Sequence, residues 1–169
     1  MTERITGRTK GRMPARWSQD QLTARLEAHD LWQKTGGQEG QLLQLTAGVF
    51  EGLDFSQGIF DGVDCSEARF IGCAMPGARF NTCRFSDTTL ENCTLTAVEM
   101  VDATFNRSVL KNCVITEGNL RGSTWLGAQL ADIDFTRCAF EGAVFEDCAF
   151  KAVSWPDDLP ASLKSLRAN

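Results

Sequence analysis

The clearest feature of the chain is a large apolar residue at every fifth position from Leu45 to Trp155. The 23 consecutive positions whose numbers are multiples of five hold no polar residue, and all 11 phenylalanines of the chain are among them. A period of five fits neither the 3.6-residue repeat of an α-helix nor the two-residue repeat of a strand. The pattern therefore predicts a structural repeat of five residues in which each unit places one large side chain inward.

The other positions of each unit predict how the chain turns. The position two before each large residue mostly holds a small residue, such as Gly58, Ala78 or Cys93. The position two after it is rich in glycine, asparagine and aspartate, which tolerate positive φ angles, and Pro76-Gly77 fits the centre of a type II turn. We therefore expect a corner after every large residue, so that the chain coils into a narrow solenoid with parallel pairing between coils.

These units resemble those of the pentapeptide-repeat family, whose loose pattern is small–polar–Leu/Phe–polar–Gly/polar. Residues 78–82 (Ala-Arg-Phe-Asn-Thr) and 103–107 (Ala-Thr-Phe-Asn-Arg) match it in full. The resemblance implies an all-β solenoid, a right-handed quadrilateral parallel β-helix with four units per coil and nearly six coils. The expected core centres are Phe50, Phe55, Phe60, Phe70, Phe80, Phe85, Phe105, Trp125, Phe135, Phe140, Phe145 and Phe150.

The segments outside the repeats of residues 43–157 predict a tail and two caps. Residues 1–16 are basic and lack an apolar period, so we expect a mobile tail. Residues 17–42 should form a capping helix and lead-in, with Ser18 and Gln21 as a capping box and a stop at Gly36-Gly37. Residues 158–169 form only a short C-terminal cap, so we expect the C-terminal end to dock a second copy or a partner protein.

The net charge of the repeats restricts the classes of partner that we expect for the predicted rod. Residues 43–155 hold 15 acidic and 8 basic residues, a net charge of −7 in a chain of net charge −5. An acidic surface argues against direct binding of nucleic acid, and no apolar segment predicts a membrane span or a secretory signal, so we expect a cytoplasmic protein. The candidate interface residues are the densest basic group and the apolar face of the C-terminal cap, namely Arg69, Arg79, Arg84, Leu159, Leu163 and Leu166.

The candidate chemical groups predict neither catalysis nor a bound cofactor or metal. Six of the seven cysteines occupy the small position of a unit and Cys65 occupies a large one, so we expect buried, reduced thiols. The single histidine, His29, lies in the predicted capping helix, where we expect a packing role. No nucleophile has an evident base, so the sequence favours a protein that is not an enzyme.

Two functions remain open at this level. Regular repeats without loops favour a non-enzymatic protein–protein interaction module, and the resemblance implies a bacterial adaptor or scaffold linked to type VI secretion components. The alternative implied by the resemblance is an acidic rod that mimics duplex DNA and binds DNA gyrase, which gives quinolone resistance. Six outward arginines weaken that mimicry, so we place the adaptor ahead of the gyrase-binding protein.

Overall fold

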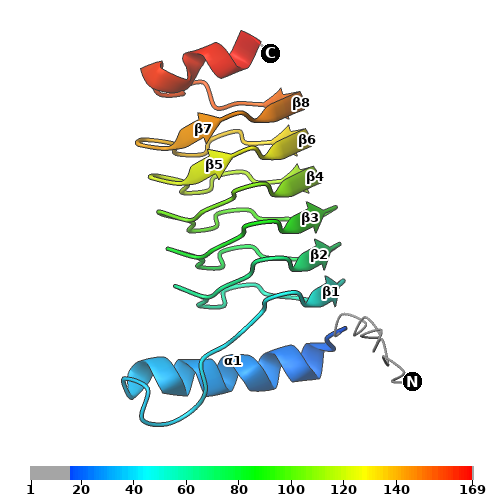
Figure 1. Cartoon of the computed structure of the whole chain (residues 1–169), viewed down its shortest axis with the longest axis vertical. Coiled ribbons are helices and arrows are strands. Elements are labelled where there is room, and N and C mark those ends of the chain that lie inside the picture. Colours follow the sequence, from blue (N-terminus) through cyan, green and yellow to red (C-terminus); the bar gives the residue numbers. More distant parts are fainter. Residues whose placement is uncertain (1–15, 169) are drawn as a thin grey trace, which may run out of the picture.

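The chain folds into a column of stacked coils with a helix below it and a short helix above it (Figure 1). The structure is a computed structural model that describes residues 16–168. The elements are α1 (Gln19–Lys34), β1 (Val49–Glu51), β2 (Arg69–Ile71), β3 (Thr89–Glu91), β4 (Val109–Val114), β5 (Thr124–Leu126), β6 (Gln129–Asp134), β7 (Val144–Glu146), β8 (Ala149–Ser154) and the 3-10 helix η1 (Ala161–Ala168). The tail predicted for residues 1–16 falls outside the described residues except for Arg16.

All strands pair in parallel, and each residue lies beside its equivalent one turn later. Strands β1, β2, β3, β4, β6 and β8 form one six-stranded sheet in that order, and β5 and β7 form a second sheet. Phe50 lies beside Phe70, and the same step repeats up the column to Phe150, which is five turns above Phe50. The predicted parallel β-solenoid with an N-terminal helix is confirmed, because four of the five-residue units complete each turn.

The corners lie where the sequence places them. Every position two after a large residue, from Ala47 to Ala152, has a φ angle between +52° and +75°. Seven of these 22 positions are glycine and six are asparagine or aspartate, which tolerate this left-handed conformation; for the side chains at the other nine it costs roughly 1–2 kcal/mol per residue. The backbone hydrogen bonds between coils hold these nine strained residues in place, so stacking sets the corner geometry where local preference does not.

The interior consists of columns of large side chains, each stacked on its equivalent in the coil below. The rings of Phe85, Phe105, Trp125 and Phe145 lie nearly parallel, with centroid separations of 4.9, 3.8 and 5.3 Å. The first three of these rings are at most 1% exposed. Each coil therefore stabilises the next through ring contacts as well as through backbone bonds, as expected of a solenoid.

The small inward positions also hold polar groups with a repeated partner. The Cys83 thiol donates to the carbonyl of Phe60 at 2.9 Å, and the Thr88 hydroxyl donates to the carbonyl of Cys65 at 2.8 Å. In both cases the acceptor belongs to a large residue in the coil below. Cysteine and threonine suit this position because they fill a small space and satisfy a carbonyl there.

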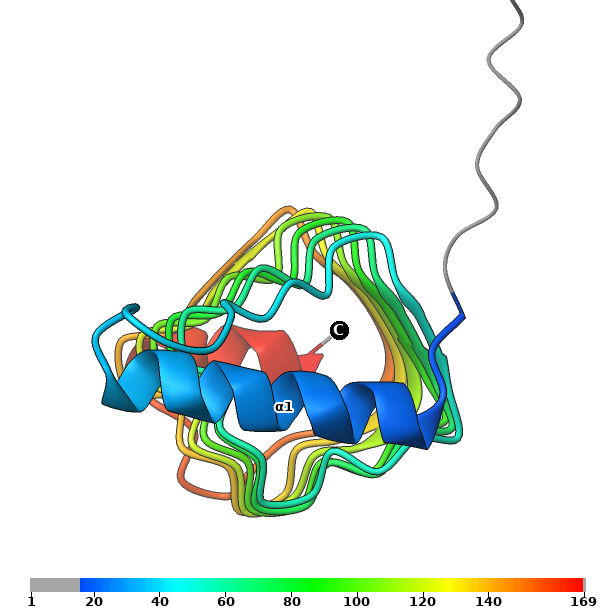
Figure 2. The ribbon, with the colours of Figure 1, turned by 90° about the horizontal axis from the view of Figure 1, so that it is seen from below.

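Helix α1 crosses the lower end of the column (Figure 2). Its capping box is formed as predicted: the Gln21 N–H donates to the Ser18 hydroxyl, and the Gln21 side chain accepts from the Ser18 N–H. Leu22 is fully buried and His29 is 1% exposed, whereas Leu31 points to solvent. The helix therefore covers the N-terminal opening of the core.

Candidate docking surfaces

Most outward basic side chains of the column are held by carboxylates of a neighbouring coil. Two of the three arginines predicted as an interface group are paired in this way, Arg79 with Asp61 and Arg84 with Asp64, at 3.4 Å in the second pair. The same arrangement occurs in Arg107–Asp87, Lys111–Glu91, Arg121–Glu141 and Arg137–Glu117. Within residues 16–168, Arg69 makes no such pair, so the predicted basic group is split into two neutralised residues and one free one.

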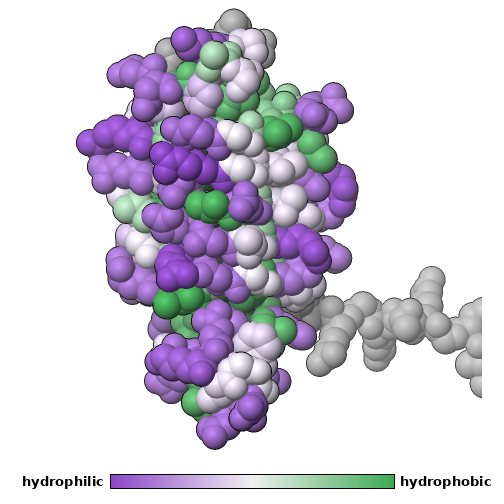
Figure 3. All heavy atoms as spheres, turned by 90° about the vertical axis from the view of Figure 1, so that its left-hand side faces the viewer, coloured by the Kyte–Doolittle hydropathy of each residue, from purple (hydrophilic) through white to green (hydrophobic). Residues whose placement is uncertain are grey.

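These ion pairs give the sides of the column a mixed polar surface. Each pair is exposed to solvent, so it is worth about 0–1 kcal/mol and does not explain the stability of the fold. Figure 3 shows one side on which hydrophilic residues dominate and hydrophobic ones are separated from one another. That side therefore offers no continuous apolar patch of the kind that marks an interface.

His29 is a packing residue that joins α1 to the lead-in. Its Nδ1 accepts a hydrogen bond from the Leu43 N–H at 3.3 Å, and its Nε2 lies 3.1 Å from the Gln33 side-chain amide. Burial lowers the pKa of His29 below its usual value of 6.5, and the carboxylates of Asp30 and Asp61 oppose this shift without cancelling it. The ring is thus held neutral in a structural role, as the sequence suggested.

The thiols are poor nucleophiles where they lie. Burial raises the pKa of Cys83 and of Cys138 to about 12, so both remain protonated at neutral pH. Cys148, in the last coil, is the only half-buried thiol among the seven free cysteines. Among the described residues, no group of three or more His, Cys, Asp or Glu side chains is placed to hold a metal ion.

The N-terminal edge of the first coil is closed by residues that precede the repeats. Arg16 forms a parallel bridge with Val49, and the Trp17 N–H donates to the Val49 carbonyl at 3.1 Å. The Gln19 side-chain amide bonds both backbone groups of Asp54, at 2.8 and 3.0 Å, in the way that a strand of a lower coil would. Arg16, placed in the tail by sequence reasoning, is thus part of the folded structure.

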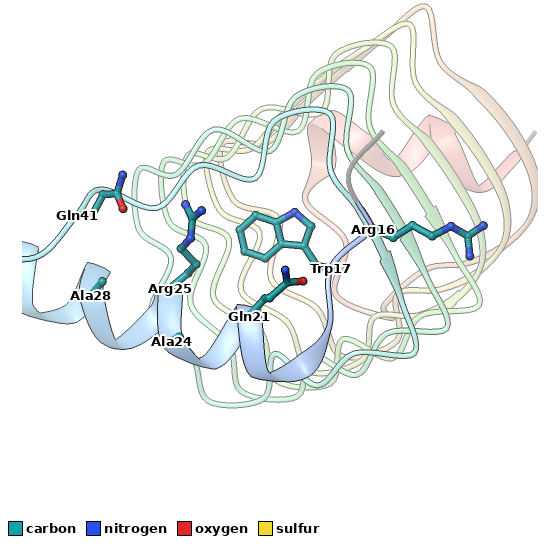
Figure 4. Close-up of a pocket in the computed structure, with 7 residues that line it drawn as sticks. All are labelled: Arg16, Trp17, Gln21, Ala24, Arg25, Ala28 and Gln41. Atoms are coloured by element: carbon teal, nitrogen blue, oxygen red, sulfur yellow. The ribbon is translucent and has the colours of Figure 1, made fainter. Parts of the chain in front are cut away.

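A cavity of about 500 Å³ lies between α1 and the first coil (Figure 4). Trp17 and Arg25 point into it, and the Arg25 guanidinium lies 5.5 Å from the centroid of the Trp17 ring. The Trp17 ring also contacts Phe50, with centroids 5.3 Å apart. The contacts with Phe50 and Arg25 give Trp17 a structural role in closing the N-terminal end of the column.

The C-terminal end is covered less completely than the N-terminal end. The first large residues, Leu45, Phe50 and Phe55, are at most 1% exposed, whereas the last, Phe150 and Trp155, are only half-buried. Strands β7 and β8 are the outermost strands of their sheets and pair on one side only within the described chain. This end therefore combines apolar side chains with an unpaired strand edge.

The leucines predicted as interface residues lie at this end but turn toward the column. Leu159 is 2% exposed and Leu163 is 6% exposed, and both belong to the core cluster. Leu166 is partly buried against the same cluster. The apolar face of the cap therefore packs against the last coil. The apolar surface that remains for a partner comes from the rims of four partly buried residues, Phe145, Phe150, Trp155 and Leu166.

Sequence reasoning missed the ion-pair columns and the closure of the first coil. The ion pairs had a readable signal, because opposite charges recur one turn apart, as in Asp87 and Arg107. The pairing of Gln19 with Asp54 had no such signal, because nothing about a single glutamine in a helix indicates which distant residue it will bond. Only the docked position of α1 determines that contact.

Four-sided coils with one large inward residue in every five define a repeat β-solenoid. The model of the family described as "Pentapeptide repeat region" matches residues 44–120 and 63–145. The chain therefore belongs to the pentapeptide repeat family. No curated protein matches the chain.

Several solved structures are similar to this chain at low sequence identity. A pentapeptide repeat protein (Rfr23) from the cyanobacterium Cyanothece 51142 is similar at 14% identity, with 79% of this chain and 99% of that chain covered and a TM-score of 0.49. QnrB1, a plasmid-mediated fluoroquinolone resistance protein, is similar at 18% identity over 76% and 91%, with a TM-score of 0.43. HetL of Nostoc sp. strain PCC 7120, involved in heterocyst differentiation regulation, is similar at 13% identity over 68% and 77%, with a TM-score of 0.43.

Proposed function

We propose that this chain is a non-enzymatic protein-binding rod, an adaptor or scaffold that docks a partner protein or a second copy through its C-terminal end. The observation that carries the proposal is the difference between the two ends. At the N-terminal end, α1, Trp17 and Gln19 cover the core and bond the backbone of the first coil. At the C-terminal end, Phe150 and Trp155 keep part of their surface exposed beside two outermost strands.

A strand edge next to apolar rings binds protein through two kinds of contact. The unpaired N–H and C=O groups of β7 and β8 accept an added strand, and the ring rims of Phe150 and Trp155 lose water when a partner covers them. Backbone bonding gives affinity, and the shape of the apolar rim gives selectivity. Neither contact requires a catalytic group, a cofactor or a loop.

The proposal extends to the compartment and to catalysis. Seven free thiols and no disulfide among residues 16–168 support a reducing compartment such as the cytoplasm. Neither α1 nor any other helix in residues 16–168 has the length and apolar character needed to cross a bilayer. The neutral, packed His29 and the protonated thiols support a role without catalysis.

Three full-length forms test the docking end: the wild type, Leu166→Glu and Val114→Glu. Leu166 lies at the partly covered rim, whereas Val114 is 44% exposed on β4, which lies between β3 and β6 in the middle of the column. We expect Leu166→Glu to weaken self-association or capture of a host protein at least tenfold, and Val114→Glu to leave both unchanged. Equal binding by the two variants would contradict a docking surface at this end.

Binding of DNA gyrase in place of duplex DNA is a second candidate, supported by the acidic excess of the rod. The 15 carboxylates of residues 43–155 exceed the 8 basic side chains, although six of those basic side chains are each held by one carboxylate. Purified gyrase and the full chain provide the test. Binding to gyrase that weakens with salt and is competed by duplex DNA supports mimicry of DNA. If the chain does not bind gyrase, the adaptor function is favoured.

A further inference from the structure

The first coil has one side on which its backbone is left open. In each coil, the residue before a large residue directs both backbone groups toward the coil below. Arg79 is an example: its N–H donates to the Gly58 carbonyl at 2.9 Å, and its carbonyl accepts from the Phe60 N–H at 2.8 Å. In the first coil, which has no coil below it, the residues in this position are Val49, Asp54, Ile59 and Asp64.

Three of these four residues find substitutes for the missing coil. The Val49 carbonyl accepts from the Trp17 N–H, and Gln19 bonds both groups of Asp54. The Asp64 carbonyl accepts from the Leu45 N–H at 3.3 Å. Ile59 differs, since no residue of 16–168 bonds its N–H or its carbonyl. One unpaired donor and one unpaired acceptor therefore point away from the column at this side.

A groove of about 300 Å³ lies beside these open groups. It is lined by Ile59 and its two preceding residues on one wall and by α1 on the other, with Leu26, Glu27, Asp30 and Gln33. The Ile59 side chain is 41% exposed. Asp30 is paired with Lys34, whereas Glu27 makes no ion pair among the described residues, and no basic residue lines the groove.

We propose that this groove is a second docking site, which binds an extended basic segment of a partner protein as one added rung below Ile59. The backbone of the segment takes the place of the missing coil: one of its carbonyls accepts from the Ile59 N–H, and one of its N–H groups donates to the Ile59 carbonyl. An apolar side chain stacks under Ile59, and a lysine or arginine faces Glu27.

The chemistry of the groove selects this occupant over other classes. An extended chain presents a carbonyl and an N–H at the spacing of a parallel rung, as Gly58 and Phe60 do toward Arg79 one coil higher. The carboxylates attract a basic segment and repel an acidic one. Two backbone bonds with one apolar contact and one ion pair predict a weak site, with a Kd on the order of 0.1–1 mM. The site lies at the opposite end of the rod from the proposed C-terminal surface and does not depend on it.

Amide exchange and chemical shifts of the full chain test the proposal, with a peptide of alternating lysine and valine as the probe. In the free chain the Ile59 amide should exchange rapidly, while the amides of Arg79, Glu99 and Asn119, which occupy the same position in higher coils, should be protected. Addition of millimolar peptide should slow exchange at Ile59 at least tenfold and shift the signals of Ile59 and Leu26.

Matched variants separate this site from general attraction to an acidic rod. We expect Glu27→Lys to weaken the peptide effect at least fivefold and Glu67→Lys, on an exposed corner of the same coil, to leave it unchanged. A peptide of alternating glutamate and valine should have no effect. The proposal is overturned if the Ile59 amide does not respond to the peptide or if the two variants behave alike. It is also overturned if the Ile59 amide is already protected in the free chain, because other residues of the same chain then occupy the groove.

Discussion

Replacing Phe105 with alanine tests the packing of the column at its centre. The ring is 1% exposed and lies between Phe85, at 4.9 Å between centroids, and Trp125, at 3.8 Å. Its removal takes one ring from a continuous column, and the neighbours above and below are held apart by backbone bonds between their coils. The space therefore cannot close by collapse of the column.

The expected loss follows from the contacts. Full burial of a phenylalanine side chain is worth about 1.5–3 kcal/mol, and an unrelaxed cavity raises the cost of Phe→Ala to about 3–5 kcal/mol. The contacts with the two neighbouring rings, each worth about 0.5–1.5 kcal/mol, are part of this cost. Because the neighbouring coils are fixed by hydrogen bonds, we expect a loss of about 4–5 kcal/mol, at the upper end of this range.

Equilibrium unfolding in urea, followed by far-ultraviolet circular dichroism, measures this loss. The matched control is Asn106→Ala, in the next position of the same coil, where the buried Oδ1 of Asn106 has no hydrogen-bond partner among the described residues. We expect that control to change the free energy of unfolding by less than about 0.5 kcal/mol. Similar small losses for both variants would refute the assigned inward and outward positions.

Three further predictions concern a corner, the buried histidine and the thiols. Thr82 is β-branched and has a φ of +58°, so Thr82→Gly should raise the free energy of unfolding by about 0.5–1 kcal/mol, and a lower unfolding temperature would contradict the corner strain. The pKa of His29 is lowered in the folded state, so the unfolded chain binds the proton more readily. The free energy of unfolding should therefore fall as the pH drops below 6.5, and it should fall less in His29→Gln. Parallel pH profiles of thermal unfolding for the two forms would refute this. Cys148 should react with a thiol reagent before the six buried cysteines, all of which should react quickly only in denaturant, and burst labelling of Cys83 in the native state would contradict its burial.

The repeating part of the fold could be predicted from the sequence because each five-residue unit has the same pattern of large, small and corner positions. Large residues at multiples of five define the inward positions, and glycine at Gly62 or Gly142 reveals the corners. The corner at Glu117 has the same geometry with no compositional sign of its own, and its assignment rests on the unbroken register. The columns of Phe85 and Phe105 follow from the turn of four units that the family resemblance implies.

The ends of the rod could not be predicted to the same degree, because their contacts do not repeat. An apolar face of Leu159, Leu163 and Leu166 is visible in the sequence, but which way that face turns depends on how the segment leaves the last coil. In the structure Leu159 and Leu163 face the core. The open groups of Ile59 were equally hidden, since they result from α1 and the lead-in covering three sides of the first coil and not the fourth.

The most direct test of the C-terminal docking end is light scattering on the full chain and on a form that ends at Asp158. The shortened form lacks η1 and the two buried leucines, so the last coil loses its partial cover. A matched control lacks residues 1–15 and keeps both α1 and η1. We expect the form ending at Asp158 to assemble to masses well above its monomer and the control to keep the mass distribution of the full chain. A form ending at Asp158 that stays monomeric and soluble would contradict a docking surface at this end.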